Sequence, residues 1–275
     1  MADNYSPIGF FDSGYGGITI LEDVKKVLPN YDYLYLGDNA RAPYGNRSFD
    51  VVYEYTWQSV KELFKRGCNL VIVACNTSSA KALRNIQQIN LKDYPNKRVL
   101  GVIRPSAEVI GDYSRTNTIG ILATEGTVKS ESYILEIVKF FPEIQIYQHA
   151  CPLWVPLIES NDFNSAEGMA LIKRDITELL QKSQKIDSII LGCTHYPIIK
   201  IIIEKFVPKG INVISQGPII AEKLKAYLEK HIWLDCLISK HATTRYLTTE
   251  TPYIFDQNVK SIFDLEISSQ YLRIL

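Results

Sequence analysis

The sequence contains little glycine and proline and no excess of either charge. Its 15 glycines and 12 prolines in 275 residues are too few for a collagen-like or low-complexity chain. Because 30 Lys and Arg side chains balance 30 Asp and Glu side chains, the formal net charge is zero. A protein dedicated to binding nucleic acid needs a surplus of cations for the phosphates. We therefore expect a globular protein with no nucleic-acid partner.

Targeting and membrane-spanning segments are also missing from the sequence. Residues Met1 to Asn4 do not begin a basic and then apolar segment of the kind that forms a secretory signal, so we expect a cytoplasmic protein. The longest apolar runs, such as Asn69 to Ala74 and Ile198 to Ile203, fall far short of the roughly 18 residues that a membrane span requires. We expect no membrane partner.

Disulfide and zinc-finger patterns are absent as well. The cysteines form an odd set without a Cys-x-x-Cys pair; they are Cys68, Cys75, Cys151, Cys193 and Cys236. Without a secretory signal, disulfides are not expected. The close pairs His149–Cys151 and Cys193–His195 lack the spacing of a structural zinc site, so we expect no metal. The thiols are then either buried small side chains or reactive groups.

Short apolar runs alternate with longer amphipathic stretches, which is typical of an α/β protein with mainly parallel strands. We predict strands at Ile8 to Phe11, Tyr31 to Leu36, Leu70 to Ala74, Val99 to Ile103, Thr118 to Leu122, Ile144 to Gln148, Ser188 to Leu191 and Asn212 to Ile214. One of the intervening helices is predicted over Ser48 to Arg66, with Gly67 placed to end it. Continuous apolar strands predict sheets that helices cover on both faces.

The two halves of the chain resemble each other weakly. Three pairs of segments match in the same order and at nearly constant spacing: Ile8 to Gly14 with Ile119 to Thr124, Ala42 to Tyr44 with Val155 to Leu157, and Leu70 to Thr77 with Ser188 to His195. Such a duplication predicts two similar, doubly wound parallel-sheet domains that face each other across a cleft. Cys75 and Cys193 are aligned by this match, so each domain would contribute one thiol.

Cys75 and Cys193 each follow an apolar strand and precede small polar residues. Open α/β sheets bind ligands at the carboxyl ends of their strands. A thiol near a helix N-terminus can have its pKa lowered from about 8.5 toward neutrality, which makes it a usable base. A single activated cysteine would indicate covalent catalysis. Two opposed thiols indicate instead that one removes a proton and the other supplies one on the opposite face, which inverts a stereocentre.

Other polar residues lie at comparable points of the chain. Asp12 and Ser13 follow the first strand, where they suit an amino acid better than a phosphate, although such a segment is often only a turn with a helix cap. His195 lies two residues from Cys193 and could exchange a proton with it or contact a carboxylate. Tyr44 and Gly45 form a predicted tight turn. The periodicity around Glu159 does not decide whether that carboxylate is functional or a solvated cap.

With these residues assembled, the chain resembles the glutamate racemases of the aspartate/glutamate racemase family, cofactor-independent enzymes that make D-glutamate for bacterial peptidoglycan. The resemblance covers nearly the whole length. The matching stretches are Phe11-Asp12-Ser13-Gly14-x-Gly16-Gly17, Gly37-Asp38-x4-Pro43-Tyr44-Gly45, Ala74-Cys75-Asn76-Thr77-x2-Ala80, Ala123-Thr124-x-Gly126-Thr127-Val128, Ala150-Cys151-Pro152-Leu153-x-Val155-Pro156-Leu157 and Leu191-Gly192-Cys193-Thr194-His195-Tyr196-Pro197. Together these stretches are highly specific for the family.

The resemblance implies a role for each matching residue. Cys75 and Cys193 would be the two acid/base thiols, serving D-glutamate and L-glutamate respectively. Asp12, Glu159 and His195 would assist them, with Asp12 near Cys75 and His195 near Cys193. The implied substrate-binding residues are Asp12, Ser13, Tyr44, Gly45, Asn76, Thr77, Thr124, Thr194 and His195. No cofactor and no metal are implied, and the expected partners are the substrate glutamate and a second copy of the chain in a homodimer.

The resemblance also implies a domain division. Residues 1–99 and 213–275 would form one domain, and residues 100–212 the other, with the active site between them. Two stretches depart from the family: Arg104 stands where an acidic or small residue is usual, and Ser215-Gln216-Gly217 stands where many members have Asp-Ser-Gly. We expect these departures to affect the dimer mode or regulation rather than the reaction.

Two alternatives remain open. The first is another reaction of the same superfamily, the racemisation of aspartate or of a hydantoin. The second is a non-catalytic protein that binds a small ligand or a partner on a racemase scaffold. The full set of motifs favours glutamate, and the intact Cys75, Cys193 and His195 favour a catalyst.

Overall fold

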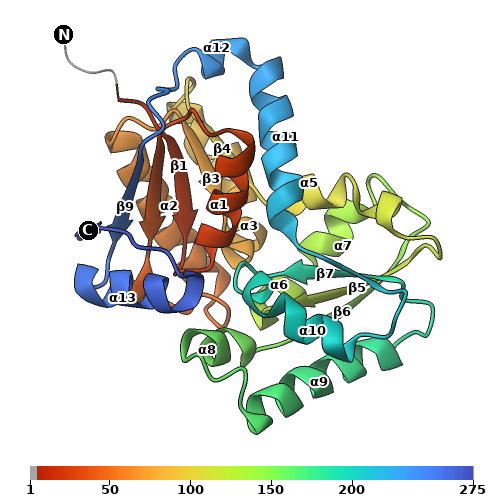
Figure 1. Cartoon of the computed structure of the whole chain (residues 1–275). Coiled ribbons are helices and arrows are strands. Elements are labelled where there is room, and N and C mark those ends of the chain that lie inside the picture. Colours follow the sequence, from red (N-terminus) through yellow and green to blue (C-terminus); the bar gives the residue numbers. More distant parts are fainter. Residues whose placement is uncertain (1–4, 275) are drawn as a thin grey trace.

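The computed structural model describes residues 5–274, which fold into two parallel sheets joined by helices (Figure 1). The first sheet has six strands in the order β10-β9-β2-β1-β3-β4. Its strands are β1 (Ile8–Asp12), β2 (Tyr33–Gly37), β3 (Leu70–Val73), β4 (Arg98–Gly101), β9 (Thr244–Thr248) and β10 (Ser269–Tyr271). The second sheet has four strands in the order β6-β5-β7-β8. They are β5 (Thr118–Ala123), β6 (Gln145–Ala150), β7 (Ser188–Gly192) and β8 (Asn212–Ile214).

Helices connect the strands and cover both sheets. The α-helices are α1 (Gly17–Val27), α2 (Phe49–Lys65), α3 (Asn76–Lys81), α4 (Leu83–Gln88), α5 (Ile103–Ala107), α6 (Glu125–Lys129), α7 (Ser132–Ile137), α8 (Trp154–Glu159), α9 (Ala166–Gln181), α10 (Lys200–Phe206), α11 (Gln216–Lys230), α12 (Ile232–Asp235) and α13 (Pro252–Phe263). Short 3-10 turns are η1 (Asn39–Arg41), η2 (Asn90–Asp93), η3 (Ile110–Tyr113) and η4 (Tyr196–Ile199). Among the residues described, none of these helices is long and apolar enough to cross a membrane.

The predicted fold class is confirmed. Every strand pairing is parallel. The duplication is visible in the strand order, because β2-β1-β3-β4 of the first sheet corresponds to β6-β5-β7-β8 of the second. The last two strands, β9 and β10, extend only the first sheet, so the C-terminal segment returns to it (Figure 1). The domain boundaries proposed from the sequence remain a prediction.

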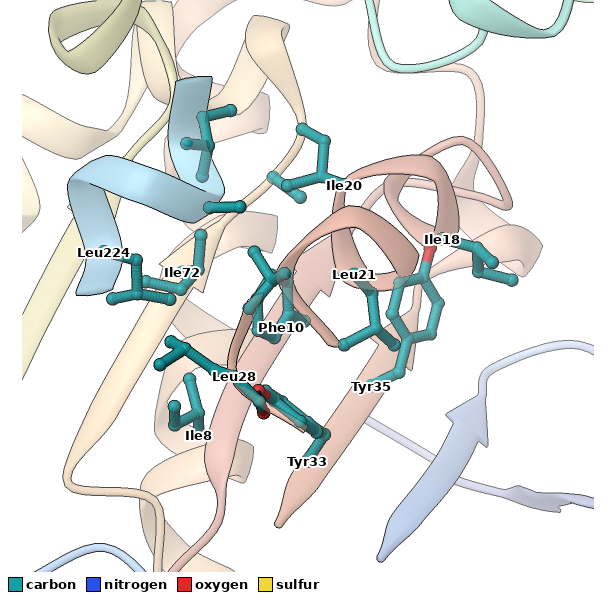
Figure 2. Packing of buried hydrophobic residues seen from close by; sticks show 14 of the residues in the cluster. Ile8, Phe10, Ile18, Ile20, Leu21, Leu28, Tyr33, Tyr35, Ile72 and Leu224 are labelled. Atoms are coloured by element: carbon teal, nitrogen blue, oxygen red, sulfur yellow. Dashed lines mark hydrogen bonds between the residues drawn. The ribbon is translucent and has the colours of Figure 1, made fainter. Parts of the chain in front are cut away.

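Alternate residues of the central strands face opposite sides of the first sheet, and each side has its own core. Phe10 of β1 packs with Leu21 of α1 and Leu224 of α11 on one side (Figure 2). Its neighbour Phe11 packs with Val60 of α2 on the other. Both sides of a strand are therefore buried, which is why β1, β2 and β3 read as continuous apolar runs. Sheets covered on both faces were predicted, and this is confirmed for the first sheet.

The ends of several predicted strands differ from the structure. The largest difference is at Val99 to Ile103, where β4 ends at Gly101 and Ile103 already begins α5. Apolar side chains continue across this boundary because Val102 and Ile103 are buried against different cores, and periodicity does not distinguish the two environments. The strands β9 and β10 were missed. The absence of a secretory signal was inferred from residues 1–4, which lie outside the described residues.

The helix predicted over Ser48 to Arg66 is confirmed as α2. Ser48 caps its first turn by accepting a hydrogen bond from the Val51 amide at 3.4 Å. Beyond its last residue, Gly67 takes a φ of +93°, a backbone conformation that favours glycine. A Cβ at Gly67 would also lie 2.6 Å from the Tyr5 carbonyl oxygen. The glycine therefore both ends the helix and allows the N-terminal segment to approach.

Replacing Gly67 by alanine should lower the free energy of unfolding by about 3 kcal/mol, because backbone strain and the contact with Tyr5 add together. Gly210 is the matched control. Its φ is +96°, but a Cβ there would meet no atom within 4 Å, so Gly210→Ala should cost only about 1–2 kcal/mol. Urea unfolding of both variants measures the difference. Equal losses would show that the approach of Tyr5 does not constrain this glycine.

Candidate active site

A cavity of about 340 Å³ lies where the carboxyl ends of strands from the two sheets meet. Ser13 follows β1 and Cys75 follows β3, whereas Thr124 follows β5 and Cys193 follows β7. The duplicated strands thus place equivalent residues at one site, as expected for ligand binding in parallel α/β sheets. The cavity is lined by the predicted site residues Ser13, Tyr44, Gly45, Cys75, Asn76, Thr77, Thr124, Glu159, Cys193, Thr194 and His195.

A second cavity, of about 680 Å³, is larger but contains none of the predicted site residues. It is lined partly by Arg104 and Tyr227, away from both thiols. Catalysis requires groups that can move protons, and the smaller cavity brings together two thiols, an imidazole and a carboxylate. We therefore treat the smaller cavity as the candidate active site.

Cys75 lies at the N-cap of α3. Its sulfur accepts a hydrogen bond from the Ser78 amide at 3.5 Å and lies 3.5 Å from the Ser13 hydroxyl oxygen. Only 6% of the residue is exposed. The small residues that follow Cys75 allow the first turn of α3 to fit against β3 and to place the backbone amide beside the sulfur. Position and surroundings agree with the prediction of a thiol at a helix N-terminus.

The expected lowering of the Cys75 pKa does not occur in the structure. Burial, together with the nearby Asp12 carboxylate, raises the pKa of this thiol to about 11, although hydrogen bonds from Ser13 and Ser78 oppose the change. The expectation was wrong because loss of hydration around a buried thiolate outweighs the attraction of one short helix. Cys75 is therefore a protonated thiol at neutral pH, which is the form that donates a proton.

Cys193 lies at the start of a chain of three polar groups. Its sulfur is 4.0 Å from Nδ1 of His195, and Nε2 of the same ring is 2.9 Å from Oε1 of Glu159 at the end of α8. The imidazole therefore bridges a thiol and a carboxylate. After Cys193 the chain passes through Thr194 and His195 into the 3-10 turn η4 and only then into α10. His195 can consequently turn back toward the cavity.

The two partners of His195 change its acidity. Burial, the largest influence, lowers its pKa, but the hydrogen bonds with Cys193 and Glu159 outweigh burial and raise the pKa from 6.5 to about 10. A folded-state pKa above the ordinary value means that this group stabilises the fold fully below about pH 6.5. The contribution is lost as the pH rises through about 10. His195 is therefore an imidazolium at neutral pH and a proton donor beside Cys193.

Replacing Glu159 by glutamine should lower the pKa of His195 by about one pH unit or more, since the carboxylate that favours the imidazolium is lost while burial remains. Titration of the His195 ring by NMR measures this directly. Glu125→Gln is the control, because Glu125 also lines the cavity but pairs with Lys129 at 2.5 Å. A His195 titration that is the same in Glu159→Gln as in the wild type would contradict the assigned contact.

Asp12 lies behind the cavity rather than on its surface. Its side chain is fully buried, with Oδ1 accepting from the Gly14 amide at 2.9 Å and Oδ2 accepting from the Thr194 hydroxyl at 3.1 Å. Burial raises the pKa of Asp12, and the positive His195 lowers it in part. Its direct contact with a substrate remains a prediction. In this structure Asp12 holds the Ser13 loop of the first sheet against the Cys193 loop of the second.

Several contacts at the site were not anticipated from the sequence. Thr19 of α1 donates a hydrogen bond to the Thr194 carbonyl at 3.0 Å, and the Tyr44 hydroxyl donates to the buried Asp38 carboxylate. Further lining residues missed as individual site residues are Gly14, Ala42, Pro43, Asn46, Glu125, Pro152, Leu153, Val155 and Pro156. Most of these residues lie inside the family motifs given above. The motifs therefore already indicated which segments line the cavity, although the residues were not predicted one by one.

Within residues 5–274, one cluster outside the site has metal-ligating side chains. Ligand atoms of His149, Cys151 and Asp175 lie within 4.8 Å of one another. The Asp175 carboxylate, however, already accepts hydrogen bonds from Trp154 at 2.8 Å and from Arg174 at 2.9 Å. The carboxylate is thus neutralised by a cation of the protein, and we assign this cluster a structural role in packing α9 on β6.

The fold and the cavity together define an amino-acid racemase class, with one thiol from each half of a duplicated α/β chain. A sequence model described as Asp/Glu/Hydantoin racemase matches residues 19–224. The chain belongs to this family.

Three relatives in this family are glutamate racemases. A glutamate racemase of Listeria monocytogenes is 39% identical over 253 residues, covering 92% of each chain. The structure of glutamate racemase isoform RacE1 from Bacillus anthracis matches with a TM-score of 0.88, at 27% identity and 98% coverage of each chain. The Francisella tularensis glutamate racemase in complex with D-glutamate matches with a TM-score of 0.86, at 30% identity and the same 98% coverage.

Proposed function

We propose that this protein interconverts L-glutamate and D-glutamate by acid–base catalysis with two thiols. The observation that carries the proposal is the convergence of Cys75 and Cys193, from equivalent strands of the two sheets, on one cavity. The protein is an amino-acid racemase, and the glutamate racemases of Listeria and Francisella are similar to it over nearly their whole length. A bound D-glutamate in the Francisella structure supports glutamate as the substrate here.

The two thiols act on opposite faces of the α-carbon. From D-glutamate, the Cys75 thiolate removes the α-proton, and the Cys193 thiol then protonates the other face of the planar carbanion. From L-glutamate the roles are reversed. Each turnover moves one proton from substrate to one sulfur and one proton from the other sulfur to product, so charge and protons balance. No cofactor and no metal take part in this mechanism.

The surroundings adjust the two sulfurs to these roles. Because burial and Asp12 hold the pKa of Cys75 at about 11, deprotonation of Cys75 has to accompany substrate binding. The ammonium group of an amino acid supplies the nearby positive charge that would lower this pKa. Beside Cys193 the protein itself provides a cation, because Nδ1 of the His195 imidazolium lies 4.0 Å from the sulfur. The two halves of the site are therefore chemically unequal although their strands are equivalent.

The intermediate carries a negative charge that the site has to stabilise. Backbone amides at Asn76 and Thr194, which follow the two thiols, are the groups we assign to the α-carboxylate. Removing a carbon-bound proton with a thiolate is difficult, so orientation and exclusion of water contribute most of the lowering of the barrier. Thr77 and Thr124 come from different halves, and their hydroxyl oxygens lie 3.0 Å apart at the cavity. This contact supports closure of the cleft over the substrate.

The biological setting follows from the reaction and is part of the proposal. D-glutamate serves bacterial peptidoglycan synthesis, and therefore cell-wall formation and cell shape. The unpaired thiols of Cys75 and Cys193 must stay reduced to act as bases, which favours the cytoplasm. We also propose a homodimer and no nucleic-acid partner. Analytical ultracentrifugation would contradict the dimer if the protein sedimented only as a monomer at the concentrations used for assay.

Assays of several substrates without added cofactor test the substrate assignment. Purified protein is incubated with L-glutamate, L-aspartate and a hydantoin, and the products are separated on a chiral column. We expect D-glutamate to form much faster than D-aspartate or the inverted hydantoin. Preferential conversion of aspartate or hydantoin would contradict the assignment to glutamate. Binding of glutamate without any conversion would indicate a non-catalytic homologue.

A further inference from the structure

The Asn76 side chain, directly after Cys75, is held at both ends. Its Oδ1 accepts a hydrogen bond from the Tyr133 hydroxyl at 2.7 Å, and its Nδ2 donates to Gln216 Oε1 at 2.8 Å. Tyr133 belongs to α7 beside the second sheet, and Gln216 is the first residue of α11. Asn76, Tyr133 and Gln216 are all at most 3% exposed. Asn76 therefore has a single buried orientation set by residues far away in the sequence.

Gln216 is itself fixed by two acceptors. Its Nε2 donates to the Val102 carbonyl at 3.0 Å and to the Ser106 hydroxyl oxygen at 2.8 Å. Val102 lies where the chain leaves β4 for α5, and Gln216 lies where the chain leaves β8 for α11. These are the two passages of the chain between the sheets (Figure 1). The glutamine amide thus joins both passages to the residue that follows Cys75.

We infer that Gln216 is a positioning residue for Cys75, a role that rests on the proposed racemase function. Cys75 caps α3, whose first residue is Asn76, so the orientation of Asn76 sets where the sulfur lies. Tyr133 and Gln216 hold that residue from the second sheet and from the crossing segments. The network therefore fixes the Cys75 half of the site relative to the half that carries Cys193. Gln216, the middle residue of Ser215-Gln216-Gly217, thus contacts a residue of the site, and the effect of this stretch on the dimer mode or regulation stays a prediction.

Replacement of Gln216 by leucine removes the amide while keeping a similar volume. Asn76, Val102 and Ser106 then each lose a buried partner. We expect kcat/KM to fall by about tenfold to a hundredfold through misplacement of the thiol. The fall must be equal in both directions, because L- and D-glutamate have the same free energy and the equilibrium constant is one. Loss of activity alone would also fit general destabilisation, so a more specific measurement is needed.

Deuterium at Cα reports on each sulfur separately. Label leaves D-glutamate through Cys75 and leaves L-glutamate through Cys193. If Gln216→Leu slows the Cys75 step, that step limits the rate more strongly. The primary kinetic isotope effect on kcat/KM should then rise for D-glutamate deuterated at Cα and fall for L-glutamate deuterated at Cα. Unchanged or parallel effects in an active variant would overturn the inference.

Two further variants complete the experiment. Ser106→Ala removes one of the two acceptors of Gln216. It should change the isotope effects in the same way with a few-fold smaller loss of kcat/KM, and it serves as the test if Gln216→Leu folds poorly. Gln87→Leu is the matched control, since Gln87 Nε2 donates to the Val99 carbonyl at 2.8 Å without contacting Asn76. Gln87→Leu should retain wild-type isotope effects, and altered effects in that variant would count against the inference. A wild-type protein that does not racemise glutamate would instead refute the proposed function.

Discussion

Replacing Cys75 by alanine is expected to lower glutamate racemisation by at least about a thousandfold, and Cys193→Ala should have an effect of the same size. Each substitution removes a group that must accept or donate a proton in every turnover. Alanine also keeps the backbone at the N-cap of α3 and after β7. Initial rates in both directions measure the loss, and circular dichroism reports whether the fold is kept.

The third cysteine in this comparison separates catalysis from general loss of thiols. Cys236 is exposed and lies at the end of α12, outside the cavity. Cys236→Ala should therefore racemise glutamate at the wild-type rate. If Cys75→Ala or Cys193→Ala kept activity within tenfold of wild type, the two-thiol mechanism would be wrong.

Replacing Gly16 by alanine should lower kcat/KM by about a hundredfold. A Cβ at Gly16 would overlap the Thr194 hydroxyl oxygen and would lie 2.5 Å from Nδ1 of His195. Something must then move, and both neighbours belong to the loop that carries Cys193. Because Asp12 of β1 and Thr19 of α1 also bind this loop, the methyl group would push apart the two halves at the site.

Gly14 in the same loop provides a comparison for Gly16. A Cβ there would lie 3.5 Å from the nearest atom, Oε1 of Glu159, which is an ordinary contact. Gly14→Ala should therefore lose much less activity than Gly16→Ala. Steady-state kinetics and thermal melting of both variants test the difference. Equal losses would mean that the close approach of the two loops at Gly16 does not set the geometry of the site.

The fold and the two thiols could be predicted because their signals are local. Buried parallel strands such as β1 and β3 are continuous apolar runs, and Cys75 and Cys193 come directly after such runs. The weak match between the halves then placed the thiols at equivalent positions. The structure confirms this equivalence in the strand order of the two sheets. Local patterns were thus sufficient for the fold class and for bringing the two sulfurs to one cavity.

Other features depend on contacts between distant residues and leave no local pattern. The strand β10 has only three residues, and β9 begins with Thr244 and Arg245, so neither stands out as an apolar run. Tyr133 and Gln216 meet Asn76 only after both sheets have formed. These features arise from the tertiary fold, so the residues next to them in the sequence do not predict them.

The acidity of Cys75 shows the same limit. The sequence indicated a helix N-terminus beside the thiol, and α3 supplies one. It did not indicate that the residue would be 6% exposed, and it placed Asp12 near Cys75 as an assisting group rather than as a charge that opposes ionisation. Burial and the Asp12 carboxylate both raise the pKa of Cys75, and Asp12 lies close to this thiol because β1 pairs with β3 inside the first sheet. Helix electrostatics considered alone therefore predicted a lowered pKa for Cys75, whereas the pKa is raised.

Racemisation of L-glutamate in deuterated water tests the central claim most directly. Because the proton that reaches the product comes from a thiol in exchange with solvent, D-glutamate formed early in the reaction should carry deuterium at Cα. The L-glutamate that remains should still carry protium. Solvent deuterium enters from the Cys75 side of the α-carbon and forms D-glutamate, whereas Cys193 faces only the side from which it removed the proton of L-glutamate. Mass spectrometry of the separated enantiomers measures both. Early D-glutamate that retains the substrate's protium would show a single base on one face and would contradict the assignment of Cys75 and Cys193 as opposed acid and base.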